Sequence, residues 1–290
     1  MVALFQNIVG GIETGSMYAL AAMGLVLIYQ TSKINNFSQG TLGMFNAFFC
    51  VTLTRAGVPL IWAILLSLCF AMVLGGLIDS FIISRVKTIS PLGRQMITLG
   101  LIMVFQGLAP MIFGTNDLPF SKMISASAID IAGVKVLPNS LLIIGITCVI
   151  MLALYLFLEK SNWGLAVRVT AANPTTAKLM GVPTKKVTMG AWAVATALGC
   201  LAALMVAPLT NVRVSMMDGI HLNSFIASVL GGFQTFYGPV VAAFIIGVAN
   251  NLIAYYVSSR WALAILYALI LVFIVIRPNG LFGKKIVSKV

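Results

Sequence analysis

The sequence predicts an all-α protein, a polytopic membrane helical bundle of eight to nine crossings in which some helices are short or interrupted. Of its 290 residues, 60% are hydrophobic and 8% are charged, and the mean hydropathy is +1.07. Such a chain has too little polar surface to cover a soluble globule. Nine apolar runs fill most of it, and basic residues are distributed unevenly between them. We therefore expect one transmembrane domain over residues 1–290.

The nine apolar runs are the candidate spans. A helix needs about 20 residues to cross a bilayer, so the second and seventh runs, which fall short, are candidates for half-helices or re-entrant segments. The first run is longer than a signal-peptide core and has no basic flank or cleavage site, so we expect it to remain in the mature protein. The runs are 4–29, 42–53, 60–83, 96–113, 141–158, 187–209, 222–230, 240–257 and 261–276.

The basic residues predict the orientation. One set of connections holds 13 of the 18 lysines and arginines, and basic residues near span ends are retained in the cytosol. This places 159–186 and the tail 277–290 in the cytosol and the loop 114–138 outside. The net charge of +12 is then a topology signal that requires no nucleic-acid partner. The richer set is Lys33, Arg85, Lys87, Arg94, Lys160, Arg168, Lys178, Lys185, Lys186, Arg277, Lys284, Lys285 and Lys289.

Two segments interrupt the helical pattern where a helix ought to continue, at 35–40 and at 231–239. Irregular backbone at membrane depth is tolerated only where protein or a water-filled cavity supplies hydrogen bonds, and paired interruptions indicate a solute path. The alternative is that each is an ordinary turn at the membrane surface. The candidate path residues here are Asn36, Phe37, Ser38, Gln39, Gly231, Gly232 and Phe233.

Small residues and one acidic residue mark two of the runs. In 187–209 small residues recur every fourth position, a stripe that lets another helix approach closely; they are Ala191, Ala195, Gly199, Ala203 and Ala207. In the first run Glu13 lies between Gly11 and Gly15. An ionisable residue in a span is costly, so Glu13 is either a carboxylate at the membrane surface or a further candidate path residue.

The segment 159–186 predicts two short helices with defined ends. Asn173 is a good N-cap, Pro174 suits the first helical position, and Gly181 is typical just beyond a helix end. We expect helices over 165–172 and 174–180, and a small apolar surface that suits a groove on another protein. The alternative is a lid resting on the bundle. The surface consists of Leu165, Val169, Ala172, Ala177 and Met180.

Motifs for catalysis are absent from the sequence. It contains no G-x-x-x-x-G-K-[ST] phosphate loop, no nucleophile with a histidine partner and no cluster of metal ligands. We therefore expect no enzyme activity, no catalytic or metal-binding residues and no cofactor. Only Glu13 and Asp79 are acidic within the long spans, both near their ends, whereas proton-coupled carriers keep titratable groups deep in the bundle. Energy is expected to enter from outside through 159–186.

Four separated motifs resemble the branched-chain amino acid ABC transporter permeases of the LivH type. The resemblance runs from about residue 11 to residue 283, and the order of the motifs makes it specific. The motifs are 15–20 with 24–25, 28–29 and 34–40; 164–168 with Ala171, Asn173, Ala177 and 179–182; 229–232 with 238–239; and 277–283.

The resemblance implies an importer of several chains in the bacterial plasma (inner) membrane, with this chain's C-terminus cytosolic. Its partners would be a second related permease, two cytosolic ABC ATPases that bind the ATP, an extracytoplasmic solute-binding protein and membrane lipid. The helix that begins at Pro174 would be the coupling helix that transmits ATPase closure. The residues that match the coupling loop are Gly164, Arg168, Ala171, Asn173, Pro174, Ala177 and Gly181.

Leucine, isoleucine and valine are the substrates that the resemblance implies. Thr41 stands where many relatives have an acidic residue, and Glu13 stands where an uncharged one is expected, so a related permease for urea, short amides or another small polar solute stays open. A self-sufficient facilitator without an ATPase is a further alternative, and it would make 159–186 a lid. A purely structural scaffold would leave both interruptions unexplained.

Overall fold

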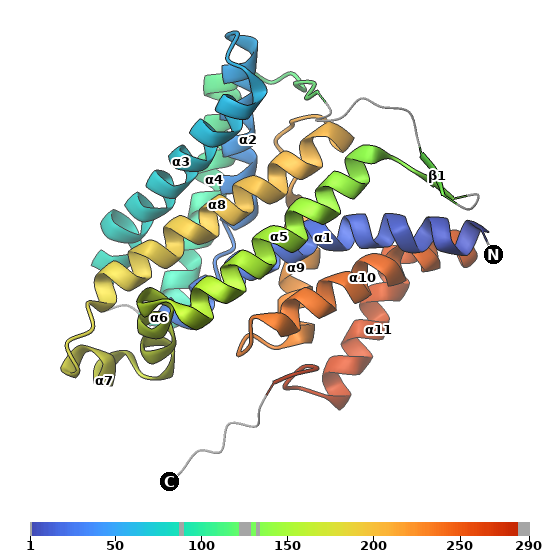
Figure 1. Ribbon diagram of the computed structural model, residues 1–290. Coiled ribbons are helices and arrows are strands. Elements are labelled where there is room, and N and C mark those ends of the chain that lie inside the picture. Colours follow the sequence, from blue (N-terminus) through green and yellow to red (C-terminus); the bar gives the residue numbers. More distant parts are fainter. Residues whose placement is uncertain (1, 87–89, 122–128, 132–133, 284–290) are drawn as a thin grey trace.

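The protein is a bundle of helices (Figure 1), as the composition predicts. The computed structural model describes residues 2–86, 90–121, 129–131 and 134–283. Its helices are α1 (Val2–Ser32), α2 (Gln39–Arg55), α3 (Leu60–Leu77) with a π turn (Ile78–Ile82) and a 3-10 turn (Ile83–Arg85), α4 (Pro91–Phe113), α5 (Pro138–Lys160), α6 (Asn162–Ala172), α7 (Pro174–Leu179), α8 (Thr184–Thr210), α9 (Asp218–Gly231), α10 (Tyr237–Tyr256) and α11 (Ala262–Ile276). Between α4 and α5, strands β1 (Ile129–Ile131) and β2 (Val134–Val136) pair antiparallel.

Each of the nine apolar runs corresponds to one helix of the described chain, and the run 60–83 continues from α3 into the two turns that follow it. Among the described residues, six helices are long and apolar enough to cross a membrane: α1, α3 with its continuation, α4, α5, α8 and α10. The second and seventh runs form α2, with 17 residues, and α9, with 14, so both helices are short, as expected. With the 15-residue α11, these elements make a multi-pass membrane protein.

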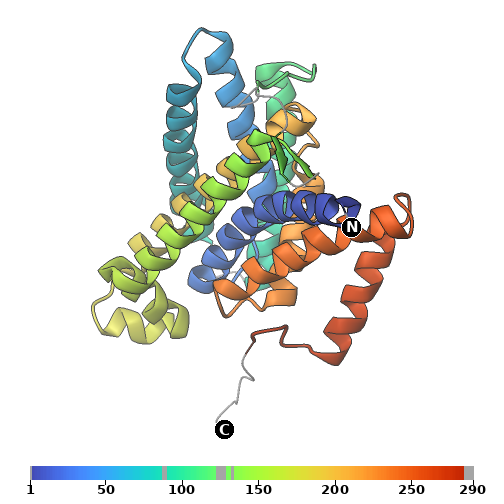
Figure 2. The same ribbon diagram turned by 45° about the vertical axis from the view of Figure 1, so that its right-hand side comes forward.

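Helix α1 is the centre of the bundle. It packs along α10, α8, α9 and α5, and the two views show it crossing between them (Figures 1 and 2). Gly11 and Gly15 face α10 so closely that a Cβ on Gly15 would lie 2.9 Å from the Phe244 Cα. The Asn223 side chain donates a hydrogen bond to the Tyr18 hydroxyl at 3.4 Å and accepts one from the Tyr267 hydroxyl at 3.2 Å. Close backbone approach and this polar tether fix α9, α10 and α11 around α1.

The small-residue stripe of α8 is buried against α2 and α3. A Cβ on Gly43 of α2 would lie 2.5 Å from the Gly199 carbonyl oxygen, and one on Gly75 of α3 would lie 2.6 Å from the Trp192 carbonyl oxygen. All five stripe residues are buried, which confirms the predicted close helix packing.

The outward faces of α3, α4, α5 and α11 are apolar. Representative exposed side chains are Ile61, Val73, Met103, Val149 and Val275. In a chain of this hydropathy such surfaces face lipid tails rather than water. The bundle therefore has a lipid-facing periphery and a separate interior that contains its polar residues.

The described connections divide between two ends of the bundle. Lys33, Arg94 and Lys178 line one cavity, so three connections of the basic set meet at one end. Arg55 lies with Pro119–Ser121 at the other end, where Leu118 also bridges Val212. Residues 277–283 lie towards the end of the bundle that contains α6 and α7 (Figure 1). Lys87, Lys122, Lys284, Lys285 and Lys289, and parts of 114–138 and 277–290, lie outside the described residues.

Candidate functional site

The first interruption lies at the middle depth of the bundle. The side-chain amide of Gln39 donates to the Ala21 carbonyl oxygen at 3.0 Å. Ala21 is eleven residues before the end of α1, so α2 begins about 16 Å inside that end. Asn36 turns the chain, since its Oδ1 accepts from the Ser38 amide and hydroxyl at 3.1 and 2.7 Å. Asn36, Ser38 and Gln39 are almost completely buried. Buried protein groups thus support the irregular backbone here, as membrane-depth backbone requires.

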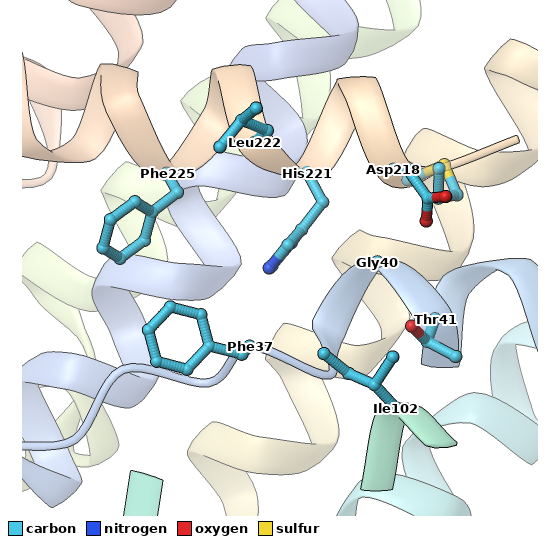
Figure 3. A pocket seen from close by; sticks show the side chains of 9 residues that line it. Phe37, Gly40, Thr41, Ile102, Asp218, His221, Leu222 and Phe225 are labelled. Atoms are coloured by element: carbon cyan, nitrogen blue, oxygen red, sulfur yellow. The ribbon is translucent and has the colours of Figure 1, made fainter. Parts of the chain in front are cut away.

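A cavity of about 180 Å³ lies beside this interruption. The start of α2, the start of α9 and the middle of α4 meet around it, so segments some 180 residues apart in the sequence form one site. Figure 3 shows the rings of Phe37 and Phe225 on one side and Asp218 with Thr41 on the other. The lining residues are Phe37, Gly40, Thr41, Ile102, Met217, Asp218, His221, Leu222 and Phe225.

His221 and Asp218 are the polar residues of this cavity that sequence reasoning missed. The His221 side chain extends from α9 into the cavity (Figure 3), and a Cβ on Gly40 would lie 2.7 Å from the His221 Cβ. Both of its ring nitrogens are buried without a hydrogen-bond partner among the described residues. Because an unpaired buried polar group is costly, this imidazole fits a site that a polar solute or water completes. The sequence feature that could have revealed this site is the helical spacing of Asp218, His221 and Phe225, which places the three side chains on one face of a helix.

Two helix N-termini meet at the cavity. Gly40 and Thr41 are in the first turn of α2, and Asp218 is the first residue of α9. Helix N-termini carry partial positive charge and attract anionic groups. The cavity therefore combines this partial charge, one carboxylate, one imidazole and apolar walls, an arrangement that suits a small solute with polar and apolar ends.

The second interruption packs against the C-terminal segment. The Leu281 amide donates to the Leu230 carbonyl oxygen at 2.7 Å, and Gly232 has a φ of +90° beside the Asn279 carbonyl oxygen. Phe233 lies against Tyr29, with ring centroids 4.6 Å apart. Gly231, Gly232 and Phe233 do not line the cavity beside α2. They join α9, the end of α1 and the C-terminal segment instead.

Glu13 lies where α1 crosses α10, apart from this cavity. Its Oε1 is buried and has no hydrogen-bond partner among the described residues. Of the candidate path residues, Phe37 therefore lies in the cavity wall. Asn36, Ser38 and Gln39 are buried next to Phe37 without lining the cavity. Glu13 lies elsewhere, on α1.

The segment 159–186 forms two helices, α6 and α7. The Asn173 Oδ1 accepts from the Thr175 and Thr176 amides at 3.0 and 3.2 Å, and Gly181 has a φ of +82°. These confirm the predicted cap at Asn173 and helix end before Gly181. The predicted start of the first helix at 165 is wrong, because the Ser161 hydroxyl caps α6 by accepting from the Gly164 amide at 2.9 Å.

The exposed surface of α7 differs from the predicted one. Ala177 is fully buried, whereas Leu179 and Met180 are 85% and 70% exposed. The prediction placed Ala177 on the surface with Met180, which is wrong, because α7 packs on the bundle through Ala177 and Met180 lies just beyond the last residue of α7. Ala177 seats α7 on the bundle, and Leu179 and Met180 project from it. Pro174, the first residue of α7, is also exposed.

Gly164 and Arg168 attach α6 to the end of α5. A Cβ on Gly164 would collide with the Leu158 carbonyl oxygen. The Arg168 guanidinium donates to the Leu158 carbonyl oxygen at 2.8 Å and pairs with Glu159 at 3.0 Å. A cation at a helix C-terminus satisfies unpaired carbonyls and the helix dipole. These contacts therefore fix α6 to the end of α5. Ala171 is half-buried on α6.

Comparison with known proteins gives matches over nearly the whole chain. Residues 7–274 match a family model described as the branched-chain amino acid transport system / permease component. A probable branched-chain amino acid transport permease protein LivH of Methanocaldococcus jannaschii is 25% identical, covering 94% of this chain and 91% of the relative. The high-affinity branched-chain amino acid transport system permease protein LivH of Salmonella typhimurium is 24% identical, covering 98% and 97%. Among solved structures, PsaBC from Streptococcus pneumoniae in complex with Fab is 15% identical, with a TM-score of 0.49 over 96% of this chain and 91% of that chain.

Proposed function

Because the chain belongs to the family of branched-chain amino acid transport permeases, we propose that it forms half of the membrane path of an ABC importer for leucine, isoleucine and valine. The observation that best supports this proposal is the cavity between α2 and α9. Asp218 and His221 lie there close to the middle of the bundle, and Leu222 beside them is 48% exposed. Charged and polar groups at this depth do not face lipid tails. A second, related permease that covers this face would complete the path.

The cavity has the chemistry of the proposed solutes. The N-termini of α2 and α9 suit a carboxylate, Asp218 suits an ammonium group, and the rings of Phe37 and Phe225 suit an aliphatic side chain. Urea and short amides lack the carboxylate and the aliphatic side chain, so these features favour the amino acids.

Energy would come from two ATPase subunits that bind the ATP, since this chain itself is proposed to need no cofactor and to catalyse no reaction. Their docking element would be α7, with α6 and Arg168 passing its movement to α5. Because the ATPase subunits are cytosolic, we propose that α7 and the C-terminus are on the cytosolic side of a bacterial inner membrane. The face with Arg55 and Pro119–Ser121 would then receive the solute-binding protein.

Transport assays in liposomes test this function. Uptake of labelled leucine is expected only when the second permease, the ATPases, the binding protein and internal ATP are all present. Unlabelled isoleucine and valine should compete with it, and urea should not. Uptake by this chain alone, without ATP, would instead establish the facilitator alternative.

His221→Leu is expected to raise the KM for leucine uptake about tenfold, because the variant removes the polar group that a bound solute would meet. The imidazole nitrogens have no hydrogen-bond partner among the residues that the structure describes, and His221→Gln should restore part of the affinity. Thr147→Val is a matched control, since Thr147 is also buried with an unpaired hydroxyl but lies outside the cavity. Equal KM values for the His221→Leu and Thr147→Val variants would contradict this role.

A further inference from the structure

A second cavity, of about 440 Å³, lies between α7 and the bundle. Its walls come from the end of α1, the turns after α3, the starts of α4 and α8, and parts of α6 and α7. Most of its lining residues have polar side chains, and they include three basic residues and one acidic residue. The lining residues are Thr31, Ser32, Lys33, Asp79, Ile83, Ser84, Arg94, Thr170, Pro174, Thr175, Lys178, Thr184 and Thr188.

The charges in this cavity are unbalanced. Lys33, Arg94 and Lys178 line it, and none of the three forms an ion pair with a described residue. The one carboxylate in the lining is that of Asp79, which accepts a hydrogen bond from the Thr188 hydroxyl at 3.2 Å. Three cations facing one carboxylate leave an excess of positive charge.

Two buried polar groups in the cavity wall lack partners. Thr170 is 1% exposed, and its hydroxyl has no hydrogen-bond partner among the described residues. The Arg94 Nε is likewise buried and unpaired. Since unpaired buried donors are costly, both groups indicate a ligand that accepts hydrogen bonds.

Lys33 is held in a conformation that lysine rarely adopts. Its φ is +54°, in the left-handed region that favours glycine, at the residue that follows α1. Partial burial also lowers the pKa of its ammonium group. A glycine would fit this turn with less strain, so the backbone at this position does not require a lysine.

We propose that this cavity binds a phosphate-bearing anion, held by Lys33, Arg94, Lys178 and the Thr170 hydroxyl. Charge-assisted bonds from lysine and arginine are the strong contacts for phosphate, and the starts of α4 and α8 add partial positive charge at the same end. The anion is either the headgroup of an acidic phospholipid or a free phosphate. Because Lys178 is on α7 and Lys33 follows α1, a bound phosphate joins α7 to the bundle.

Two binding measurements distinguish the sources. In the first, the detergent-purified full chain is titrated with inorganic phosphate, with sodium chloride at equal ionic strength as the reference, and the unfolding midpoint is followed. In the second, native mass spectrometry compares retention of phosphatidylglycerol with that of phosphatidylcholine. Binding in the first assay identifies a free phosphate, and selective retention in the second identifies a lipid headgroup.

Lys33→Gly and Arg94→Gln are each expected to weaken the observed binding about tenfold. Lys33→Gly should fold at least as well as the parent chain because glycine adopts the positive φ freely, so its loss of binding cannot be attributed to unfolding. Lys160→Gln removes an exposed charge at the same end but outside the cavity, and it should bind like the parent. The proposal is overturned if the chain prefers neither phosphate over chloride nor phosphatidylglycerol over phosphatidylcholine. It is also overturned if Lys33→Gly binds as tightly as the parent chain.

Discussion

Replacing Leu179 and Met180 together by asparagine is expected to abolish ATP-driven uptake while the chain stays folded. Both side chains project from α7, 85% and 70% exposed, so they contribute little to the packing of the bundle. Large apolar anchors at an interface contribute about 1–3 kcal/mol each. The affinity for the ATPase subunits should therefore fall by roughly a hundredfold, as measured by copurification and by leucine-stimulated ATP hydrolysis.

A matched control separates docking from a general effect of surface polarity. Leu137, before α5 at the opposite end, is also exposed, at 44%. Leu137→Asn puts a good N-cap residue at the N-cap position of α5, so it should fold well and leave ATPase binding unchanged. If the double variant on α7 still binds the ATPases and supports uptake like Leu137→Asn, then α7 is not the docking element.

Gly247→Ala is expected to destabilise the protein by about 2–3 kcal/mol. The new Cβ would collide with the Gly11 carbonyl oxygen and lie 2.6 Å from the Gly15 amide nitrogen. Backbone atoms cannot turn away as a side chain does, so α1 and α10 would have to separate along their whole crossing. The measurement is the thermal unfolding midpoint of the purified chain in detergent.

Gly145→Ala is the matched control for this prediction. Gly145 lies within α5, with open space where a Cβ would be. Alanine is favoured over glycine in a helix interior by about 0.5–1 kcal/mol, so this variant should unfold at the same or a slightly higher temperature. The close crossing of α1 and α10 would be contradicted if both variants shifted the midpoint equally.

The sequence predicted those parts of the structure that depend on near neighbours. Asn173 and Gly181 mark the ends of α7 because a cap involves residues only two or three positions away. The stripe through Gly199 predicted a close helix partner, since small residues permit this wherever the partner comes from. Counting apolar residues likewise gave nine helices and identified α2 and α9 as short.

Features that depend on the packing of distant segments were not predictable. No local rule brings His221 to Gly40 or directs Ala177 inward and Leu179 outward. The same holds for Lys33, Arg94 and Lys178, which are far apart in the chain but share one cavity. The sequence by itself determined a multi-pass helical bundle with a capped pair of helices at its basic end, because hydropathy, charge and caps act over a few residues. Only the tertiary structure decided which polar groups meet, because that depends on how helices from separate parts of the chain pack around α1.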